Sequence, residues 1–185
     1  VLTVLLAGCQ GNKNQNQGPK TTPFIGGTTG LAIEFQKNSP PAEVYDGGDF
    51  PFEAVVRLEN KGEYDIPKDK VQVKISGIRA EEFGVSSGDL LKNPDSDILA
   101  TVKDSEGNIR AGTPVFVQFS GLNRKEPLAG NNEFTFMAEV CYLYETTANA
   151  KVCIRENNID ERKASGVCIV EQKKAVYNSG APVQV

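Results

Sequence analysis

Cysteine is the residue type in this chain with the most reactive side chain, because its thiolate is a nucleophile and a metal ligand. The sequence of 185 residues has four cysteines, at positions 9, 141, 153 and 168. Cys9 follows an apolar run, Val1-Leu2-Thr3-Val4-Leu5-Leu6, and the two small residues Ala7 and Gly8. Small side chains allow an extended backbone to enter a peptidase cleft. This setting predicts that the thiol of Cys9 accepts a lipid.

The four residues Leu6-Ala7-Gly8-Cys9 resemble the lipobox of bacterial and some archaeal lipoproteins. The resemblance implies that residues 1–9 are the remnant of a lipoprotein signal, and we expect the sequence to be a fragment that begins inside it. An ordinary signal peptide is the alternative. A transmembrane anchor fits less well, because a spanning helix needs about 20 apolar residues. A diacylglyceryl group on Cys9 would meet the requirement of two acyl chains for stable anchoring.

Three cysteines remain if Cys9 carries lipid, so at most one disulfide can form within the chain. Cys153 and Cys168 enclose a polar stretch, and a bridge between them would close a loop of about 15 residues, worth about 3 kcal/mol in the chain-entropy model. The alternative is a bridge between Cys141 and Cys153 across a hairpin. We expect the remaining thiol to be buried as a small hydrophobic group, or else to bridge two subunits. The sequence has no His, which argues against a zinc site.

Acidic residues are clustered at three places, and carboxylate clusters can bind calcium. These are Asp46 with Asp49, Asp95 with Asp97, and Asp104 with Glu106 and Asn108. The run Asp104-Ser105-Glu106-Gly107-Asn108 resembles half of an EF-hand loop, but the Gly and Glu required further along do not follow. Asp and Gly together are also typical of tight turns. We therefore expect turns at these places, with no metal and no cofactor.

Charge and composition exclude several classes of function. The chain has 20 Lys and Arg against 24 Asp and Glu, a formal net charge of -4. A basic nucleic-acid footprint and a polybasic membrane patch are therefore not supported. The absence of His removes the commonest general base, and the sequence contains neither a phosphate-binding loop nor a nucleophile elbow. We expect no catalytic residues.

Residues 10–29 are poor in the apolar side chains that a core requires, and residues 10–23 contain none larger than Pro. Such a segment is predicted to be a flexible linker, and about 20 residues of it would span roughly 25 Å as a coil. It would hold the folded part away from a lipid surface.

From residue 30 onward the chain is predicted to form strands. Apolar residues alternate with polar ones, or form short β-rich runs broken by Gly, Pro, Asn and Asp. The expected strands cover residues 31–35, 42–45, 50–58, 71–75, 115–119, 134–144, 150–155, 166–170 and 174–177, with 150–155 as the hairpin partner of 134–144. This spacing favours an all-β fold, an antiparallel β-sandwich over residues 30–178. Residues 179–185 are expected to begin a further strand or domain.

Two resemblances extend this interpretation. Residues 44–75, above all Phe52-Glu53-Ala54-Val55-Val56-Arg57-Leu58-Glu59-Asn60-Lys61-Gly62, resemble the opening strands of bacterial and archaeal immunoglobulin-like modules of the adhesion-related and galactosidase-associated kinds. Gly84-Val85-Ser86-Ser87-Gly88-Asp89-Leu90, Leu128-Ala129-Gly130-Asn131, Cys141-Tyr142-Leu143-Tyr144-Glu145-Thr146 and Ser179-Gly180-Ala181-Pro182-Val183 resemble an uncharacterised group of archaeal surface proteins. The second resemblance implies a location and a fold, but no activity.

The sequence therefore predicts a non-enzymatic lipoprotein on the outer face of a cell membrane or in the envelope, held by the lipid on Cys9. It would act as a structural or adhesive β module with a protein or glycan partner. One alternative is a filament subunit that self-associates by donating the strand near residues 30–35 to a neighbour. The other is an accessory domain of a larger surface enzyme.

Overall fold

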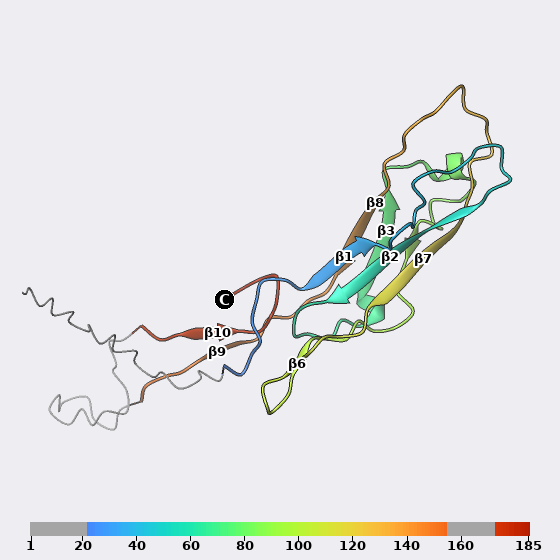
Figure 1. The fold of residues 1–185 in the computed structure, drawn as a ribbon. Coiled ribbons are helices and arrows are strands. Elements are labelled where there is room, and N and C mark those ends of the chain that lie inside the picture. Colours follow the sequence, from blue (N-terminus) through green and yellow to red (C-terminus); the bar gives the residue numbers. More distant parts are fainter. Residues whose placement is uncertain (1–21, 155–172) are drawn as a thin grey trace, which may run out of the picture.

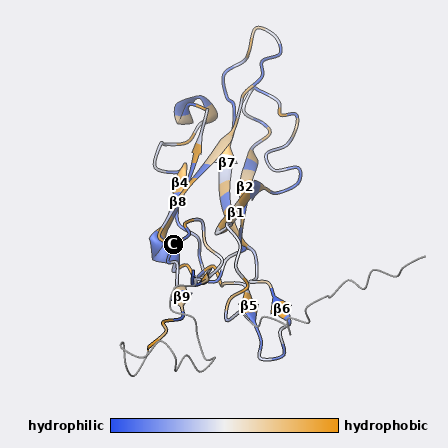
Figure 2. Cartoon of the chain, turned by 90° about the vertical axis from the view of Figure 1, so that its left-hand side faces the viewer, coloured by the Kyte–Doolittle hydropathy of each residue, from blue (hydrophilic) through white to orange (hydrophobic). Residues whose placement is uncertain are grey.

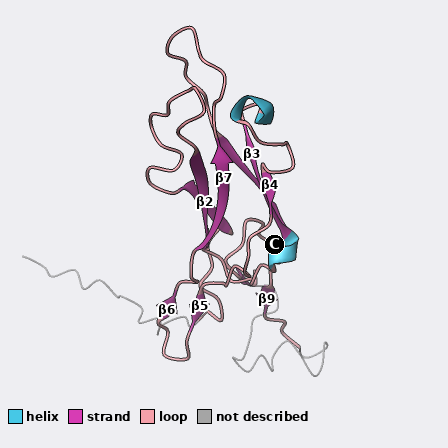
Figure 3. Cartoon of the chain, turned by 90° about the vertical axis from the view of Figure 1, so that its right-hand side faces the viewer, coloured by secondary structure: helices cyan, strands magenta, loops and turns pink. Residues whose placement is uncertain are grey.

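The computed structural model describes residues 22–154 and 173–185 (Figure 1). Within these residues the regular structure is strand, apart from two short 3-10 turns (Figure 3). The strands are β1 Leu31–Phe35, β2 Phe52–Asn60, β3 Val71–Ser76, β4 Leu91–Lys92, β5 Val102–Lys103, β6 Ile109–Arg110, β7 Val115–Leu122, β8 Met137–Tyr142, β9 Ala148–Ala150 and β10 Val176–Asn178; the 3-10 turns are η1 Lys68–Lys70 and η2 Ala80–Phe83. The prediction of an all-β fold is confirmed, as is that of antiparallel pairing.

The first sheet has the strand order β1-β2-β7. Strand β2 lies in the middle: its second half, residues 56–60, pairs with β1, and residues 52–58 pair with β7, so that Val56, for example, pairs with both Phe35 and Val117. Its valine-rich sequence suits this position, because β-branched side chains pack well on a pleated surface. Hydrophobic and hydrophilic residues alternate along much of β2 and β7, so that one face of the sheet is apolar (Figure 2).

The second sheet has the order β4-β3-β8. Strand β3 alternates strictly: Val71, Val73 and Ile75 are buried, whereas the residues between them are exposed. The apolar faces of the two sheets share a single core, to which β2, β3 and β7 contribute the most deeply buried side chains. We call this pair of sheets the two-sheet body; β1 lies against β8 at one side of it.

Two short ribbons lie at one end of the two-sheet body. One is the hairpin β5–β6, and the other is formed by β9 and β10 (Figure 1). Ala148–Ala150 therefore pairs with Val176–Asn178, and the predicted hairpin between residues 134–144 and 150–155 is wrong. Thr147 and Ser179 join the two strands at the base of the β9–β10 ribbon. The backbone N–H of Ser179 donates to the carbonyl of Thr147, and the backbone N–H of Thr147 donates to the Ser179 hydroxyl. The predicted strand at 166–170 lies outside the described residues.

The carboxylate of Glu63 joins both ends of the described chain to the two-sheet body. It accepts hydrogen bonds from the backbone N–H groups of Ile25 and Gly26, each at 3.0 Å, and from that of Gly180 at 2.6 Å. Residues 25 and 26 belong to the predicted linker, and Gly180 to the predicted start of a further strand or domain. Ser179, Gly180 and Ala181 are all buried. In the described ranges, no helix is long and apolar enough to cross a membrane.

Candidate functional site

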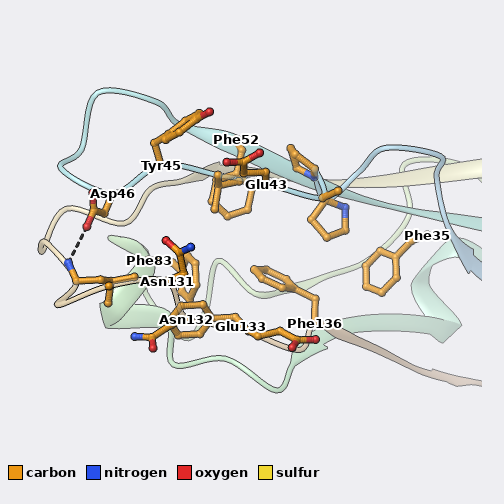
Figure 4. Close-up of a pocket in the computed structure, with 17 residues that line it drawn as sticks. Phe35, Glu43, Tyr45, Asp46, Phe52, Phe83, Asn131, Asn132, Glu133 and Phe136 are labelled. Carbon is orange, nitrogen blue, oxygen red and sulfur yellow. Dashed lines mark hydrogen bonds between the residues drawn. The ribbon is translucent and has the colours of Figure 1, made fainter.

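An open cavity of about 670 Å³ is lined by loops at the end of the two-sheet body opposite the two ribbons (Figure 1) and is shown in close-up in Figure 4. One wall is the loop between β1 and β2, which contributes Pro40, Pro41, Glu43 and Tyr45. The other wall is the loop between β7 and β8, from Leu128 to Phe136, so the walls come from segments almost ninety residues apart in the sequence. We call this cavity the aromatic pocket.

Phenylalanine rings form the inner surface of the aromatic pocket. Phe83, which ends η2 and is 1% exposed, lies at the centre. Its ring contacts those of Phe52, Phe134 and Phe136 edge to face, with centroid separations of 6.0, 5.2 and 5.5 Å. This arrangement suits the quadrupoles of aromatic rings and contributes more than the burial of area alone. The pocket therefore has a floor that is fixed by the core beneath it.

Carboxylates stand on the rim of the aromatic pocket. Glu43 and Asp46 come from one wall and Glu133 from the other, and Figure 4 shows the two walls facing each other. Among the described residues that line the pocket, none is basic. An apolar floor beneath acidic groups favours a ligand that carries both an apolar group and a positive charge, because each part then meets a complementary surface.

Hydrogen bonds hold the two loops together. Asp46 accepts the backbone N–H of Leu128 at 2.6 Å, which ties the first wall to the second. The side chain of Asn123 donates to the carbonyl of Gly48 at 2.7 Å, behind the same turn. Residues 42–45 were expected to form a strand, but they are loop in the structure. The preceding Pro40 and Pro41 have no backbone N–H for a ladder, which accounts for the difference.

The structure tests the cysteine predictions in part. Cys141 lies on β8, is exposed and carries a free thiol. The alternative bridge between Cys141 and Cys153 is therefore wrong, and so is the expectation that the odd thiol is buried. Cys9 and Cys168 lie outside the described residues, so lipidation of Cys9 and a bridge between Cys153 and Cys168 stay predictions.

The acidic clusters lie in turns and loops, as predicted. The carboxylate of Asp104 accepts the backbone N–H groups of Glu106 and Asn108 within the β5–β6 hairpin. The hydrogen bond from the side-chain amide of Asn108 is the main reason that the pKa of Asp104 is lowered. Asp97 accepts the backbone N–H of Lys68. In the part of the chain that the structure describes, no three His, Cys, Asp or Glu side chains are grouped as metal ligands.

The aromatic pocket is the feature that sequence reasoning missed. Its signal was present as a set of phenylalanines in or beside loops, at positions 35, 52, 83, 134 and 136, but nothing in the sequence brings these positions together. Comparisons with known proteins add no information on the site, because no family model, no curated protein and no solved structure matches the chain.

Proposed function

We propose that this chain is a non-enzymatic surface module that binds another protein through the aromatic pocket, in keeping with an adhesive role. The observation that carries the proposal is the combination of a phenylalanine floor with a rim of carboxylates. The partner segment would present an apolar or aromatic side chain next to Lys or Arg. A polypeptide is favoured over a glycan, because the rings of the floor pack edge to face against one another, whereas sugars stack on an open ring face.

The strand order supports an immunoglobulin-like architecture for the module. Immunoglobulin domains place strands A, B and E in one sheet and strands C and F in the other, with an added C′ in variable-type domains. The sheets β1-β2-β7 and β4-β3-β8 correspond to A-B-E and C′-C-F in this scheme. Adhesive modules often use the loops at one end of such a scaffold, and the aromatic pocket is built from loops of this kind.

The proposed location is the outer face of a cell membrane, with the lipid on Cys9 as the anchor. Mass spectrometry of the N-terminus of the protein isolated from its native membrane tests this directly. A diacylglyceryl adduct on Cys9 is the expected result. An unmodified Cys9, or an N-terminus created by cleavage after it, would remove the lipid anchor from the proposal.

Binding is tested with arrays of short synthetic peptides and, in parallel, a glycan array. The chain should retain peptides that combine Phe or Leu with neighbouring Lys or Arg, and should retain neither their Asp and Glu counterparts nor glycans. The double variant Glu43→Gln and Glu133→Gln should lose this preference, whereas the exposed Glu126→Gln, outside the pocket lining, should keep it. Glycan retention without peptide retention, or robust hydrolytic turnover of either array, would contradict the proposal.

The filament hypothesis has less support. It needs the strand near residues 30–35 to be donated to a neighbour, but Leu31–Phe35 is β1 and pairs with β2 of its own chain. Donation would therefore break the pairing of all five β1 residues with β2 before any pairing with the neighbour formed. Concentration-dependent polymers of the mature chain would restore that hypothesis.

A further inference from the structure

The outer edge of β8 has no strand beside it in the described structure. Strand β8 is the last in the order β4-β3-β8, and the strand that follows it, β9, pairs with β10 instead. In the immunoglobulin-like scheme this edge is the position of strand G. Figure 1 shows β8 along one margin of the two-sheet body, away from the β9–β10 ribbon.

Backbone hydrogen-bonding groups are directed outward along this edge. The N–H of Leu143 donates to the carbonyl of Lys70, and the register places Cys141 opposite Gln72. Hydrogen-bonded pairs alternate along an antiparallel ladder, so Glu139 and Cys141 bond to β3. The N–H and C=O groups of Ala138, Val140 and Tyr142 therefore point to the open side. Such a row of groups is a template for pairing with another strand.

Apolar side chains at this edge are covered incompletely. Ala138 and Val140 face the core but are only half-buried, and Ile33 on the adjacent β1 is 39% exposed. The corresponding residues in the middle of each sheet, Val56 and Val73, are 0% exposed. An added strand would therefore remove apolar surface from water as well as complete the backbone hydrogen bonds.

Strand β8 also lacks the usual protection of an edge. It has no Pro and no Lys, and its one charged residue is Glu139. That carboxylate is engaged within its own sheet, with the hydroxyl of Ser76 at 2.6 Å and the ammonium of Lys74 at 3.9 Å. Exposed edges are normally protected by Lys, Pro or inward-pointing charges.

We propose that β8 pairs with β8 of a second copy of this chain, antiparallel, about a two-fold axis at Cys141. An axis at Glu139 would place two carboxylates directly opposite each other, and an axis at Val140 would leave them diagonal, at about 7–8 Å; both are unfavourable. An axis at Cys141 pairs Glu139 with Leu143 of the second copy, and Val140 with Tyr142 of the second copy. Glu139 then lies opposite an apolar residue, and the nearest acidic residue of the second copy, Glu145, lies beyond the end of β8. The outward backbone groups of Val140 and Tyr142 bond to each other.

This pairing closes on itself. Each copy contributes its β8 edge, and the two sheets β4-β3-β8 join into one continuous sheet. A two-fold interface of this kind uses the same surface on both copies and leaves no equivalent edge for a third. The proposal is thus a dimer rather than a filament, and it does not depend on what the aromatic pocket binds.

The test is sedimentation equilibrium of the chain carrying Cys9→Ser, which removes the predicted lipid. A dimer at micromolar concentration is expected. Val140→Pro removes an N–H that the monomer does not use, and Cys141→Lys places two positive charges opposite each other on the axis. Each should raise the dissociation constant of the dimer at least tenfold, while Cys141→Ser should leave it unchanged. Circular dichroism and melting of the monomeric variants check that the fold is kept.

Cys141 also reports the register. In the proposed dimer Cys141 forms a non-hydrogen-bonded pair with Cys141 of the second copy. Their Cα atoms would be about 4.5 Å apart, a separation that a disulfide can span. Oxidised glutathione should convert two Cys141 thiols to one bridge and release two glutathione thiols, and peptide mapping should find Cys141 joined to Cys141. A chain that stays monomeric, a dimer unaffected by Val140→Pro, a bridge through another cysteine or growing polymers would each overturn the proposal.

Discussion

Replacing Glu63 by Gln should loosen both ends of the described chain at once. The carboxylate accepts three backbone N–H groups, two of them on Oε2, from Gly26 and Gly180, and one on Oε1, from Ile25. A glutamine keeps one acceptor oxygen and turns the other position into an N–H donor that faces a donor. At least one hydrogen bond is lost, and the rest lose their charge assistance.

The expected cost follows from these contacts. A hydrogen bond to a charged group contributes about 1.5–3 kcal/mol, and Glu63 is half-buried, so water replaces part of the loss. We expect the free energy of unfolding to fall by about 2 kcal/mol, which for a chain of this size lowers the melting temperature by roughly 4–8 °C.

Calorimetry and amide hydrogen exchange measure this effect. The melting temperature of Glu63→Gln is compared with that of Glu81→Gln, an exposed position where no more than about 0.5 kcal/mol is expected. Exchange at Gly26 and Gly180 should accelerate in the first variant only. Unchanged melting together with unchanged protection of Gly180 would show that Glu63 does not hold the chain ends.

Two further predictions concern the same end of the two-sheet body. Gly62→Ala should destabilise the protein by about 1–3 kcal/mol in a denaturant titration, because a Cβ at this position would overlap the Tyr144 hydroxyl and the Gly180 carbonyl; an unchanged midpoint would contradict this packing. Hydrogen bonds from Lys61 and then from Arg57 lower the pKa of Glu59. This carboxylate therefore stabilises the fold above its ordinary pKa of about 4.3, and its contribution disappears as the pH falls through the lower folded value. The melting temperature of Glu59→Gln should lie below that of the parent chain at neutral pH and approach it in acid; a constant gap would refute the assignment.

Sequence reasoning found the strands whose pattern is strict. Strand β3 alternates over its whole length, and β2 is a valine-rich run that ends at an Asn-Lys-Gly turn, so local pattern and burial agree. It failed at residues 150–155, where an apolar alternation after a turn resembles a hairpin partner. The chain instead pairs β9 with the distant β10, and Thr147 and Ser179 are hydrogen-bonded to each other at the base of this ribbon.

The aromatic pocket was out of reach for a related reason. Each wall is an irregular loop with no period to detect, and the bond from Leu128 to Asp46 that joins them spans a large part of the sequence. Phe134 and Phe136 were assigned to a strand together with β8, because aromatic residues favour strands. Only the structure shows that their rings pack against Phe83, which is distant in the sequence.

The most direct test of the proposed function is a nuclear magnetic resonance titration with a short Lys- and Phe-containing peptide. The account predicts saturable shifts of the ring signals of Phe134 and Phe136, none at β9 and β10, and loss of binding in the double variant Glu43→Gln and Glu133→Gln. Absence of any shift for peptides that the array retained, or shifts confined to surfaces away from the aromatic pocket, would contradict it.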